Sequence, residues 1–221
     1  MASNVVIEAV AYELGPHRIT STEIESQIAE TMARLDIPPG QMERLTGIKE
    51  RRFWDAGTMP SDVATLAAQK LLDQTDVDPR QIGCLINTSV CRDYLEPSVA
   101  ALVQGNLKLP ATCMNFDIGN ACLGFVNAID MLTLMIDAGR FQYGLIVDGE
   151  SSREINELTM EMLKQPSTSR QTFFENFATL TLGSGAVAML IAHKDVAKSA
   201  HRINGSVSRS ATEHSRLCLG N

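Results

Sequence analysis

The 221-residue sequence lacks several features that would assign a class of protein at once. Its first residues, 1–7, have neither the basic segment nor the long apolar run of a secretion signal. No CxxC pair occurs, and the cysteines form no pattern with histidine that suits a zinc site. An odd, scattered set of cysteines fits free thiols in the reducing cytosol, so we expect a cytoplasmic protein without a metal. The cysteines are Cys84, Cys91, Cys113, Cys122 and Cys218.

Positive charge is also scarce, since 19 Lys and Arg face 26 Asp and Glu for a formal net charge of −7. This balance argues against a nucleic-acid partner or a general attraction to anionic membranes. The apolar stretch after Cys122 is too short to span a bilayer and is interrupted by Asp130, so no membrane span is expected. Gly183 and Gly185 lack the GxGxxG spacing and the following helix of a dinucleotide site, and we expect no cofactor.

What the sequence does contain is an alternation of apolar strands and amphipathic helices. With 44% hydrophobic and 20% charged residues, it has the composition of an ordinary soluble domain. The alternation predicts an α/β fold with a largely parallel sheet. We expect strands at residues 5–12, 82–89, 111–118, 143–147, 187–192 and 202–208. We expect helices at residues 20–35, 61–73, 99–103, 122–138 and 155–163, and a short one near 173–177.

The most informative stretch is residues 115–130, which predicts a strand end, a tight turn at Gly119 and Asn120, and a helix starting almost at Cys122. A thiol at the first turn of a helix faces unpaired backbone N–H groups and the positive end of the helix dipole, which favour thiolate. The alternative, a small buried hydrophobe, is equally compatible with the local pattern. Apolar residues cover nearly every face of this helix, so we expect it to be buried all round.

Two other segments contain candidate functional residues. Residues 45–54 are rich in cationic and aromatic side chains, and Arg51 and Arg52 either belong to a solvated loop or contact an anionic pantetheine or nucleotide carrier. Glu96 precedes Pro97, which fits the first turn of a helix. Glu96 or Ser98 could therefore serve simply as a helix cap.

Several motifs, taken together, resemble the 3-oxoacyl-ACP synthase III branch of the thiolase superfamily. Residues 116–125 resemble its nucleophile motif, and residues 46–52 its early Gly-Ile-Arg-Glu-Arg segment. Residues 182–188 resemble its Gly-rich strand entry, with Ser184 where an acidic residue is commoner. Within that branch, residues 86–98 and 147–150 resemble the OleA family, the thiolase-like enzymes that begin bacterial long-chain olefin biosynthesis.

The resemblance implies a fold, a reaction and partners. The fold is the layered α-β-α-β-α arrangement of two repeats, with the first repeat in residues 1–195 and the truncated start of the second in 196–221. OleA enzymes join two long-chain fatty acyl-CoA molecules head to head, without decarboxylation in the condensation step, and release a β-keto acid. The chain would thus be an acyltransferase whose substrates are coenzyme A thioesters. Downstream olefin-pathway enzymes would be further partners.

The resemblance also assigns roles to single residues. Cys122 would be the nucleophile that accepts the first acyl chain, and its backbone N–H would form part of an oxyanion hole. Glu96 matches the glutamate that reaches across a homodimer into the partner's site. An unactivated acyl thioester must lose a weakly acidic α-proton, which requires a positioned base such as this carboxylate. Arg51 and Arg52 would contact the substrate.

The sequence departs from the family pattern in two places. The histidine and asparagine motifs of the second repeat do not occur in the 221 residues, and Gln41 and Leu45 stand where the branch has an adenine-stacking Trp and an Arg. Two alternatives to the OleA reaction therefore stay open. One is a decarboxylating synthase III that starts fatty-acid or polyketide chains. The other is a non-catalytic fragment or structural subunit.

Overall fold

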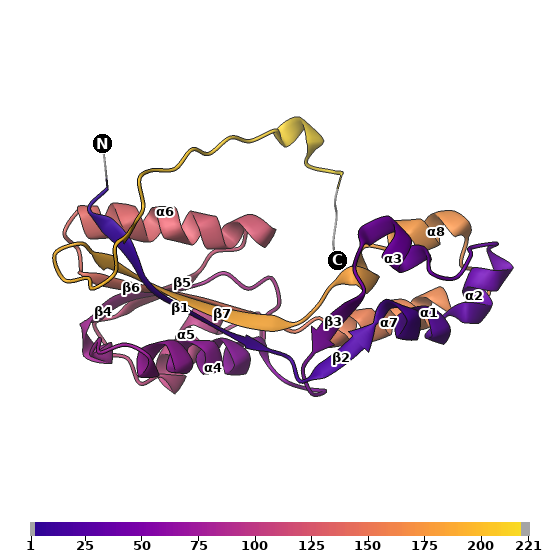
Figure 1. The fold of residues 1–221 in the computed structure, drawn as a ribbon, viewed down its shortest axis with the longest axis horizontal. Coiled ribbons are helices and arrows are strands. Elements are labelled where there is room, and N and C mark those ends of the chain that lie inside the picture. Colours follow the sequence, from indigo (N-terminus) through magenta and orange to yellow (C-terminus); the bar gives the residue numbers. More distant parts are fainter. Residues whose placement is uncertain (1–2, 218–221) are drawn as a thin grey trace.

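The computed structural model describes residues 3–217, which form two parts side by side along the long axis of the molecule (Figure 1). The larger part is a six-stranded sheet with helices on both faces, and the smaller part is mainly helical with a two-stranded sheet. Cys218 and the rest of residues 218–221, which belong to the expected start of the second repeat, lie outside the described residues.

The larger sheet has the strand order β5-β4-β6-β7-β1-β8. β4 pairs in parallel with β5 and β6, whereas β7 is antiparallel to β6 and β1, and β8 is antiparallel to β1. Four strands (β5, β4, β6 and β1) therefore run in one direction, which confirms the α/β class and the mostly parallel sheet. The strands are β1 (Val5–Leu14), β4 (Ile82–Asn87), β5 (Met114–Asp117), β6 (Tyr143–Glu150), β7 (Gly185–His193) and β8 (His201–Arg202).

Helices cover both faces of this sheet. α4 (Pro60–Asp73) and α5 (Val99–Asn106) lie on one face, and α6 (Gly124–Asp137) lies on the other (Figure 1). Each face has its own apolar core, one containing Ala67 of α4 and Leu145 of β6, the other containing Leu132 of α6 and Ile146 of β6. The successive residues Leu145 and Ile146 point to opposite faces, as the alternation of a strand requires.

The expectation that α6 is buried all round is wrong for the described chain. One face packs on the sheet, through Gly124, Ala128, Leu132 and Ile136. The opposite face is exposed because no other element of residues 3–217 is packed over it. Its exposed apolar side chains are Val126, Met131 and Leu134, and Leu123 is exposed just before the helix.

The smaller part is built from β2 (His17–Thr20) and β3 (Glu50–Phe53), which pair antiparallel, and from five helices. A capping box starts α1, because the Thr20 hydroxyl accepts from the Glu23 N–H and the Glu23 carboxylate accepts from the Thr20 N–H. The helix expected to run on to Leu35 is broken at Ile28 into two. The helices are α1 (Ser21–Gln27), α2 (Ala29–Arg34), α3 (Gln41–Thr46), α7 (Arg153–Leu163) and α8 (Arg170–Glu175).

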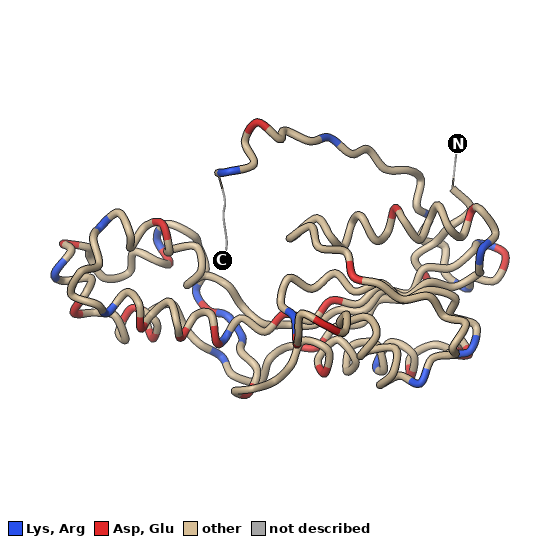
Figure 2. Tube along the Cα trace, turned by 180° about the vertical axis from the view of Figure 1, so that it is seen from behind, with Lys and Arg blue, Asp and Glu red and all other residues tan. Residues whose placement is uncertain are grey.

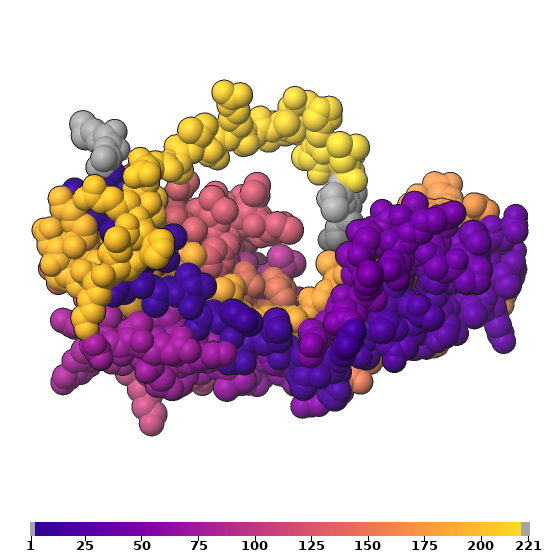
Figure 3. Space-filling view, in the orientation of Figure 1, coloured from indigo at the N-terminus to yellow at the C-terminus, as the bar shows by residue number. Residues whose placement is uncertain are grey.

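The chain leaves the sheet after β8 and arches away from the body, as the yellow segment of Figure 3 shows. The strand expected at residues 202–208 is wrong beyond Arg202, and Val207 is 87% exposed. Four short 3₁₀ turns complete the described residues: η1 (Pro79–Gln81), η2 (Ala121–Leu123), η3 (Thr179–Thr181) and η4 (Thr212–His214). Among the described helices, none has the length and apolar character needed to cross a membrane. Lys and Arg are spread over both parts and interleaved with Asp and Glu (Figure 2).

Candidate active site

The candidate site lies where three neighbouring parallel strands end. β5, β4 and β6 lie side by side and point the same way, so the segments that follow them meet at one edge of the sheet. These segments are residues 88–98 after β4, residues 118–123 after β5, and residues 151–152 after β6. Glu96 lies in the first and Cys122 in the second. The topology therefore brings the two predicted catalytic residues to the same edge.

The backbone is tightly packed where the Cys122 turn passes β4. A Cβ on Gly124 would stand 3.0 Å from the Ile118 carbonyl oxygen and 3.3 Å from that of Thr88. A Cβ on Gly119 would stand 3.4 Å from the guanidinium of Arg92. These contacts fix the turn that carries the thiol against the start of the segment that carries Glu96.

Cys122 itself is exposed. It lies in η2, and α6 begins two residues later at Gly124 rather than almost at Cys122 as predicted. The residue before it, Ala121, has φ +44°, a left-handed conformation that costs a non-glycine residue about 1–2 kcal/mol. The alternative of a small buried hydrophobe is wrong, because the thiol faces solvent at the end of a strained turn. Such strain is common at functional sites.

Glu96 is exposed and does not cap a helix. α5 begins at Val99 and is capped by the Ser98 hydroxyl, which accepts from the Ala101 N–H at 3.2 Å. Pro97 therefore lies before the cap instead of in the first turn. The helix-cap alternative for Glu96 is wrong, and the Ser98 alternative is confirmed.

The two arginines lie on β3, and Arg51 is only 5% exposed. Its Nη2 donates to Ser21 Oγ at 3.0 Å and contacts Met42 Sδ at 3.3 Å, and burial lowers its pKa. Arg52 is half-buried. The solvated loop expected for residues 45–54 is therefore wrong at β3. A substrate contact by either arginine stays a prediction, and Arg52 is the more accessible of the two.

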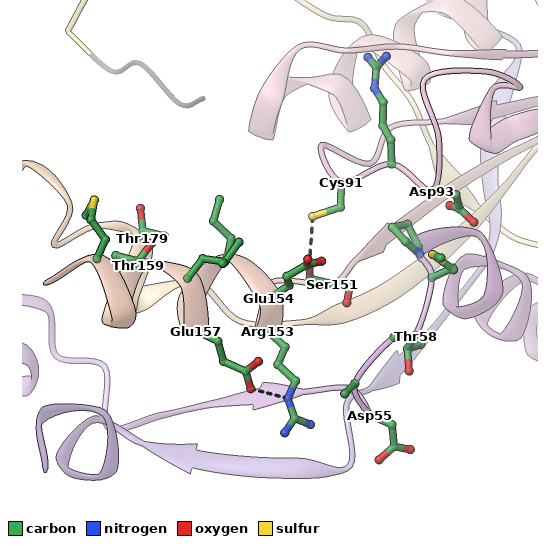
Figure 4. Close-up of a pocket in the computed structure, with 18 of the residues that line it drawn as sticks. Asp55, Thr58, Cys91, Asp93, Ser151, Arg153, Glu154, Glu157, Thr159 and Thr179 are labelled. Carbon is green, nitrogen blue, oxygen red and sulfur yellow. Dashed lines mark hydrogen bonds and ion pairs between the residues drawn. The ribbon is translucent and has the colours of Figure 1, made fainter. Parts of the chain in front are cut away.

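A groove of about 1140 Å³ opens beside this edge, between the loop of residues 55–60, residues 91–93 and α7. Cys91 points into it, with its Sγ 3.5 Å from the Ser151 carbonyl oxygen (Figure 4). Burial, and secondly the Glu150 carboxylate, raise the pKa of the Cys91 thiol to about 12. Cys91 therefore stays protonated near neutral pH and is a poor nucleophile.

Sequence reasoning missed a polar cluster at the ends of β4 and β6. The Thr88 hydroxyl donates to Asp148 Oδ2 at 2.6 Å, and the Gly149 N–H donates to Ser89 Oγ at 2.8 Å. Burial raises the pKa of Asp148 to about 6, against the lowering effect of the Thr88 hydroxyl. Residues 86–98 and 147–150 could be matched as family-like motifs, but nothing in them indicated that Thr88 and Asp148 would lie in contact.

Comparisons with known proteins agree with this architecture. Residues 116–211 match the family described as 3-Oxoacyl-[acyl-carrier-protein (ACP)] synthase III. The chain is 44% identical over 218 residues to the acyl-CoA:acyl-CoA alkyltransferase of Xanthomonas campestris and 38% identical over 220 residues to that of Shewanella oneidensis. These alignments cover 99% and 98% of this chain but 64% and 62% of the relatives, so the chain spans less than two thirds of their length.

Solved structures give the same result. A cysteine-to-serine variant of Xanthomonas campestris OleA, with bound lauric acid and lauroyl-CoA, superposes with a TM-score of 0.96 at 42% identity, covering 100% of this chain and 66% of that one. A histidine-to-alanine variant of the same protein gives a TM-score of 0.95 at 44% identity, covering 99% and 64%. With the sheet order, the motifs and these matches in agreement, the chain has a thiolase-like fold and contains a 3-oxoacyl-ACP synthase III domain at residues 116–211.

Proposed function

We propose that this chain carries the nucleophile and the base of an OleA-type acyl-CoA:acyl-CoA alkyltransferase acting on long-chain fatty acyl-CoA. The enzyme would work in the cytosol as a homodimer and would begin long-chain olefin biosynthesis. The histidine and asparagine motifs of the family's second repeat do not occur in residues 1–221, so the proposal assigns roles to Cys122 and Glu96 alone. In this proposal residues 1–195 are the first repeat, and residues 196–221 start the second.

One observation carries the proposal. The glutamate and the cysteine substituted in structures of Xanthomonas campestris OleA stand 26 positions apart in that chain, and Glu96 and Cys122 are separated by the same 26 positions. Both residues are exposed, and both lie in segments that leave the same edge of the sheet. The shared spacing supports the assignment of Cys122 as nucleophile and Glu96 as base.

The first step that follows is acylation of Cys122. Its sulfur attacks the carbonyl carbon of one acyl-CoA, the bond from that carbon to the CoA sulfur breaks, and CoA leaves as the thiol with the proton from Cys122. An acyl thioester on Cys122 remains. The N–H of Cys122 would stabilise the oxyanion that forms on the carbonyl oxygen.

The second step is condensation. The Glu96 carboxylate removes an α-proton from a second acyl-CoA, and the carbanion attacks the carbonyl carbon of the acyl-cysteine. The carbon–sulfur bond to Cys122 breaks, and the thiolate regains a proton through Glu96. Hydrolysis of the resulting β-ketoacyl-CoA releases the β-keto acid and CoA. General base catalysis of this kind typically contributes about 10²–10⁴-fold.

Mass spectrometry after incubation with lauroyl-CoA tests the first step. We expect one acyl adduct on the peptide containing Cys122, none in Cys122→Ser, and an undiminished adduct in Cys91→Ser, the matched control. The 221-residue chain and any longer product of the same reading frame should be compared. An adduct on Cys91, or no adduct on Cys122 in either protein, would contradict the proposal.

The decarboxylating alternative rests on the family match and on 34% identity, over 65% of this chain, to the Beta-ketoacyl-[acyl-carrier-protein] synthase III of Streptococcus uberis. Glu96→Ala separates the two reactions. A malonyl donor makes its carbanion by losing CO₂, so a malonyl-dependent enzyme keeps its condensing activity in this variant. An OleA-type enzyme keeps acylation of Cys122 but loses condensation by about 10²-fold or more.

A further inference from the structure

The segment that carries Glu96 is held at both ends by carboxylates from other strands. At its start, Glu150 of β6 accepts from the Val90 N–H at 2.7 Å and from the Cys91 N–H at 3.2 Å. At its end, Asp117 of β5 accepts from the Val99 N–H at 3.0 Å and from the Ala100 N–H at 2.9 Å. Each carboxylate thus takes two consecutive backbone N–H groups, one pair on either side of Glu96.

A third anchor lies inside the segment, where the Asp93 carboxylate accepts from the Ser61 N–H at 3.0 Å and from the Ser61 hydroxyl at 2.5 Å. The residues from Tyr94 to Glu96 have no comparable support. Leu95 is 88% exposed and Tyr94 is 55% exposed. Within residues 3–217, no hydrogen bond is recorded for Tyr94, Leu95 or Glu96. The direction in which Glu96 points is therefore set by the anchors on either side of it, which hold residues 90–93 before it and residues 99–100 after it.

Asp117 connects this segment to the nucleophile. It is the last residue of β5 and stands five positions before Cys122, in the strand that leads into the turn of the thiol. The next residue, Ile118, donates its N–H to the Asn87 carbonyl oxygen of β4 at 2.9 Å. One carboxylate therefore joins the strand that carries Cys122 to the helix that follows Glu96.

We propose that Asp117 and Glu150 are positioning residues that set the place of Glu96 relative to the acyl thioester. The inference rests on the proposed function, because it assigns Glu96 the role of base. The inference concerns the direction in which the segment presents Glu96. It holds whether Glu96 acts beside Cys122 of the same chain or beside Cys122 of a second copy. Neither residue touches the substrate in this scheme.

Asp117→Asn is the sharpest probe. An amide has one oxygen that accepts and one NH₂ group that donates, so it can bind only one of the two N–H groups and faces the other with a donor. The end of the segment is then released without removing bulk. Glu150→Gln makes the same change at the other end.

Ser98→Ala is the matched control. It removes the other N-terminal cap of α5, the hydrogen bond from the Ala101 N–H to Ser98 Oγ, and so weakens the same helix by about 1 kcal/mol. It leaves the link between α5 and β5 intact. If Asp117 only stabilised α5, then Asp117→Asn and Ser98→Ala would lower the rate of condensation to the same extent.

The experiment measures two rates and one exchange pattern. Acylation of Cys122 by lauroyl-CoA and formation of the β-keto product are followed separately, and amide hydrogen exchange is followed for peptides spanning residues 94–100 and 124–137. In Asp117→Asn we expect acylation within about threefold of wild type and condensation lowered about 10–100-fold, because small misplacements of catalytic groups have effects of this size. Exchange should rise at 94–100 and stay unchanged at 124–137.

The outcomes separate this inference from the proposed function. If wild type forms no acyl-Cys122, the proposed function fails, and the inference is judged on exchange alone. If Asp117→Asn slows both steps equally, or leaves exchange at residues 94–100 unchanged, the inference is overturned. It is also overturned if Ser98→Ala matches the loss of condensation.

Discussion

α4 and α6 are both 14-residue helices packed on the same sheet, on opposite faces, yet they differ in what they turn outward. The exposed residues of α4 are Asp62, Leu66, Gln69 and Asp73, three of them polar. Those of α6 are Val126, Met131, Leu134 and Asp137, three of them apolar. α4 thus has the outer face of an ordinary surface helix, whereas the outer face of α6 has the composition of an interior.

The helices also differ in how closely they lie on the sheet. A Cβ on Gly149 of β6 would stand 2.3 Å from the Pro60 carbonyl oxygen, so the sheet meets the backbone of α4 directly. A Cβ on Gly144 of β6 would stand 2.8 Å from the Leu132 side chain, so the sheet meets α6 through side chains. α4 is held on the sheet by close backbone contact, whereas α6, beyond its first residue Gly124, packs on the sheet through large side chains.

One side of α6 is buried and the other exposed, so substitutions on the two sides should differ in how much they lower the free energy of unfolding. The largest loss is expected for Leu132→Ala. Leu132 is 0% exposed and lies in the core between α6 and the sheet. Removing a buried leucine side chain typically costs about 2–5 kcal/mol, whereas the matched change Leu134→Ala, at a position 67% exposed, should cost under about 0.5 kcal/mol. Urea denaturation measures both. Equal losses would mean that the outer face of α6 is covered in solution.

The next largest effect on the free energy of unfolding is expected from ionisation of Asp148, on the face of the sheet that α6 covers. Asp148 lies two residues after Ile146 in β6 and so points to the same face, that of α6. Its pKa is raised from 3.8 to about 6, mainly by burial. In the unfolded chain it ionises near pH 4, whereas in the folded chain it keeps its proton up to about pH 6. Stability contributed by this residue therefore falls as pH rises from about 4 to 6, and stays low above that.

Asp148→Asn should remove this loss. We expect the variant to gain about 1–3 kcal/mol over wild type at pH 7 and about nothing at pH 3.5, as measured by urea denaturation at both values. Thr88→Val removes the hydroxyl that favours the ionised form of Asp148. In this variant the fall in the free energy of unfolding should therefore continue to a higher pH than in wild type. A gain of the same size at both pH values would point to packing instead of titration.

The two helices also show which parts of the fold are readable from sequence. The strands at β4, β6 and β7 and the helices at α4 and α7 were predicted because their apolar residues recur with the period of a strand or a helix. The same rule misjudged α6. The residues of α6 are apolar on nearly every side, which predicts burial all round. A sequence pattern shows which helix faces are apolar enough to be buried, but it does not show whether another element of the described chain covers them.

The candidate site was predictable to a different degree. Cys122 and Glu96 could be named from motifs, since each stands in a short run of characteristic residues. The contact of Asp117 with the start of α5 could not, because it joins residues 17 and 18 positions apart through a capping bond that leaves no local pattern. The burial of Arg51 was missed for a similar reason, because its partner Ser21 lies 30 positions away.

The smallest effect is expected for the outer face of α6, and it tests the comparison between the helices most directly. Val126→Gln combined with Met131→Gln replaces two exposed apolar side chains, at 51% and 43% exposure, with polar ones of good helix propensity. Neither side chain belongs to a buried cluster, so the free energy of unfolding should change by less than about 0.5 kcal/mol. Binding of a hydrophobic dye such as anilinonaphthalene sulfonate should nevertheless fall, because an exposed apolar patch is removed.

Leu66→Gln on α4, at 55% exposure, is the control and should leave dye fluorescence unchanged, since its exposed neighbours along the helix are polar. A clear loss of stability in the double variant alone would show that this face of α6 is packed against another surface, and equal dye binding by all three proteins would remove the distinction between the two helices.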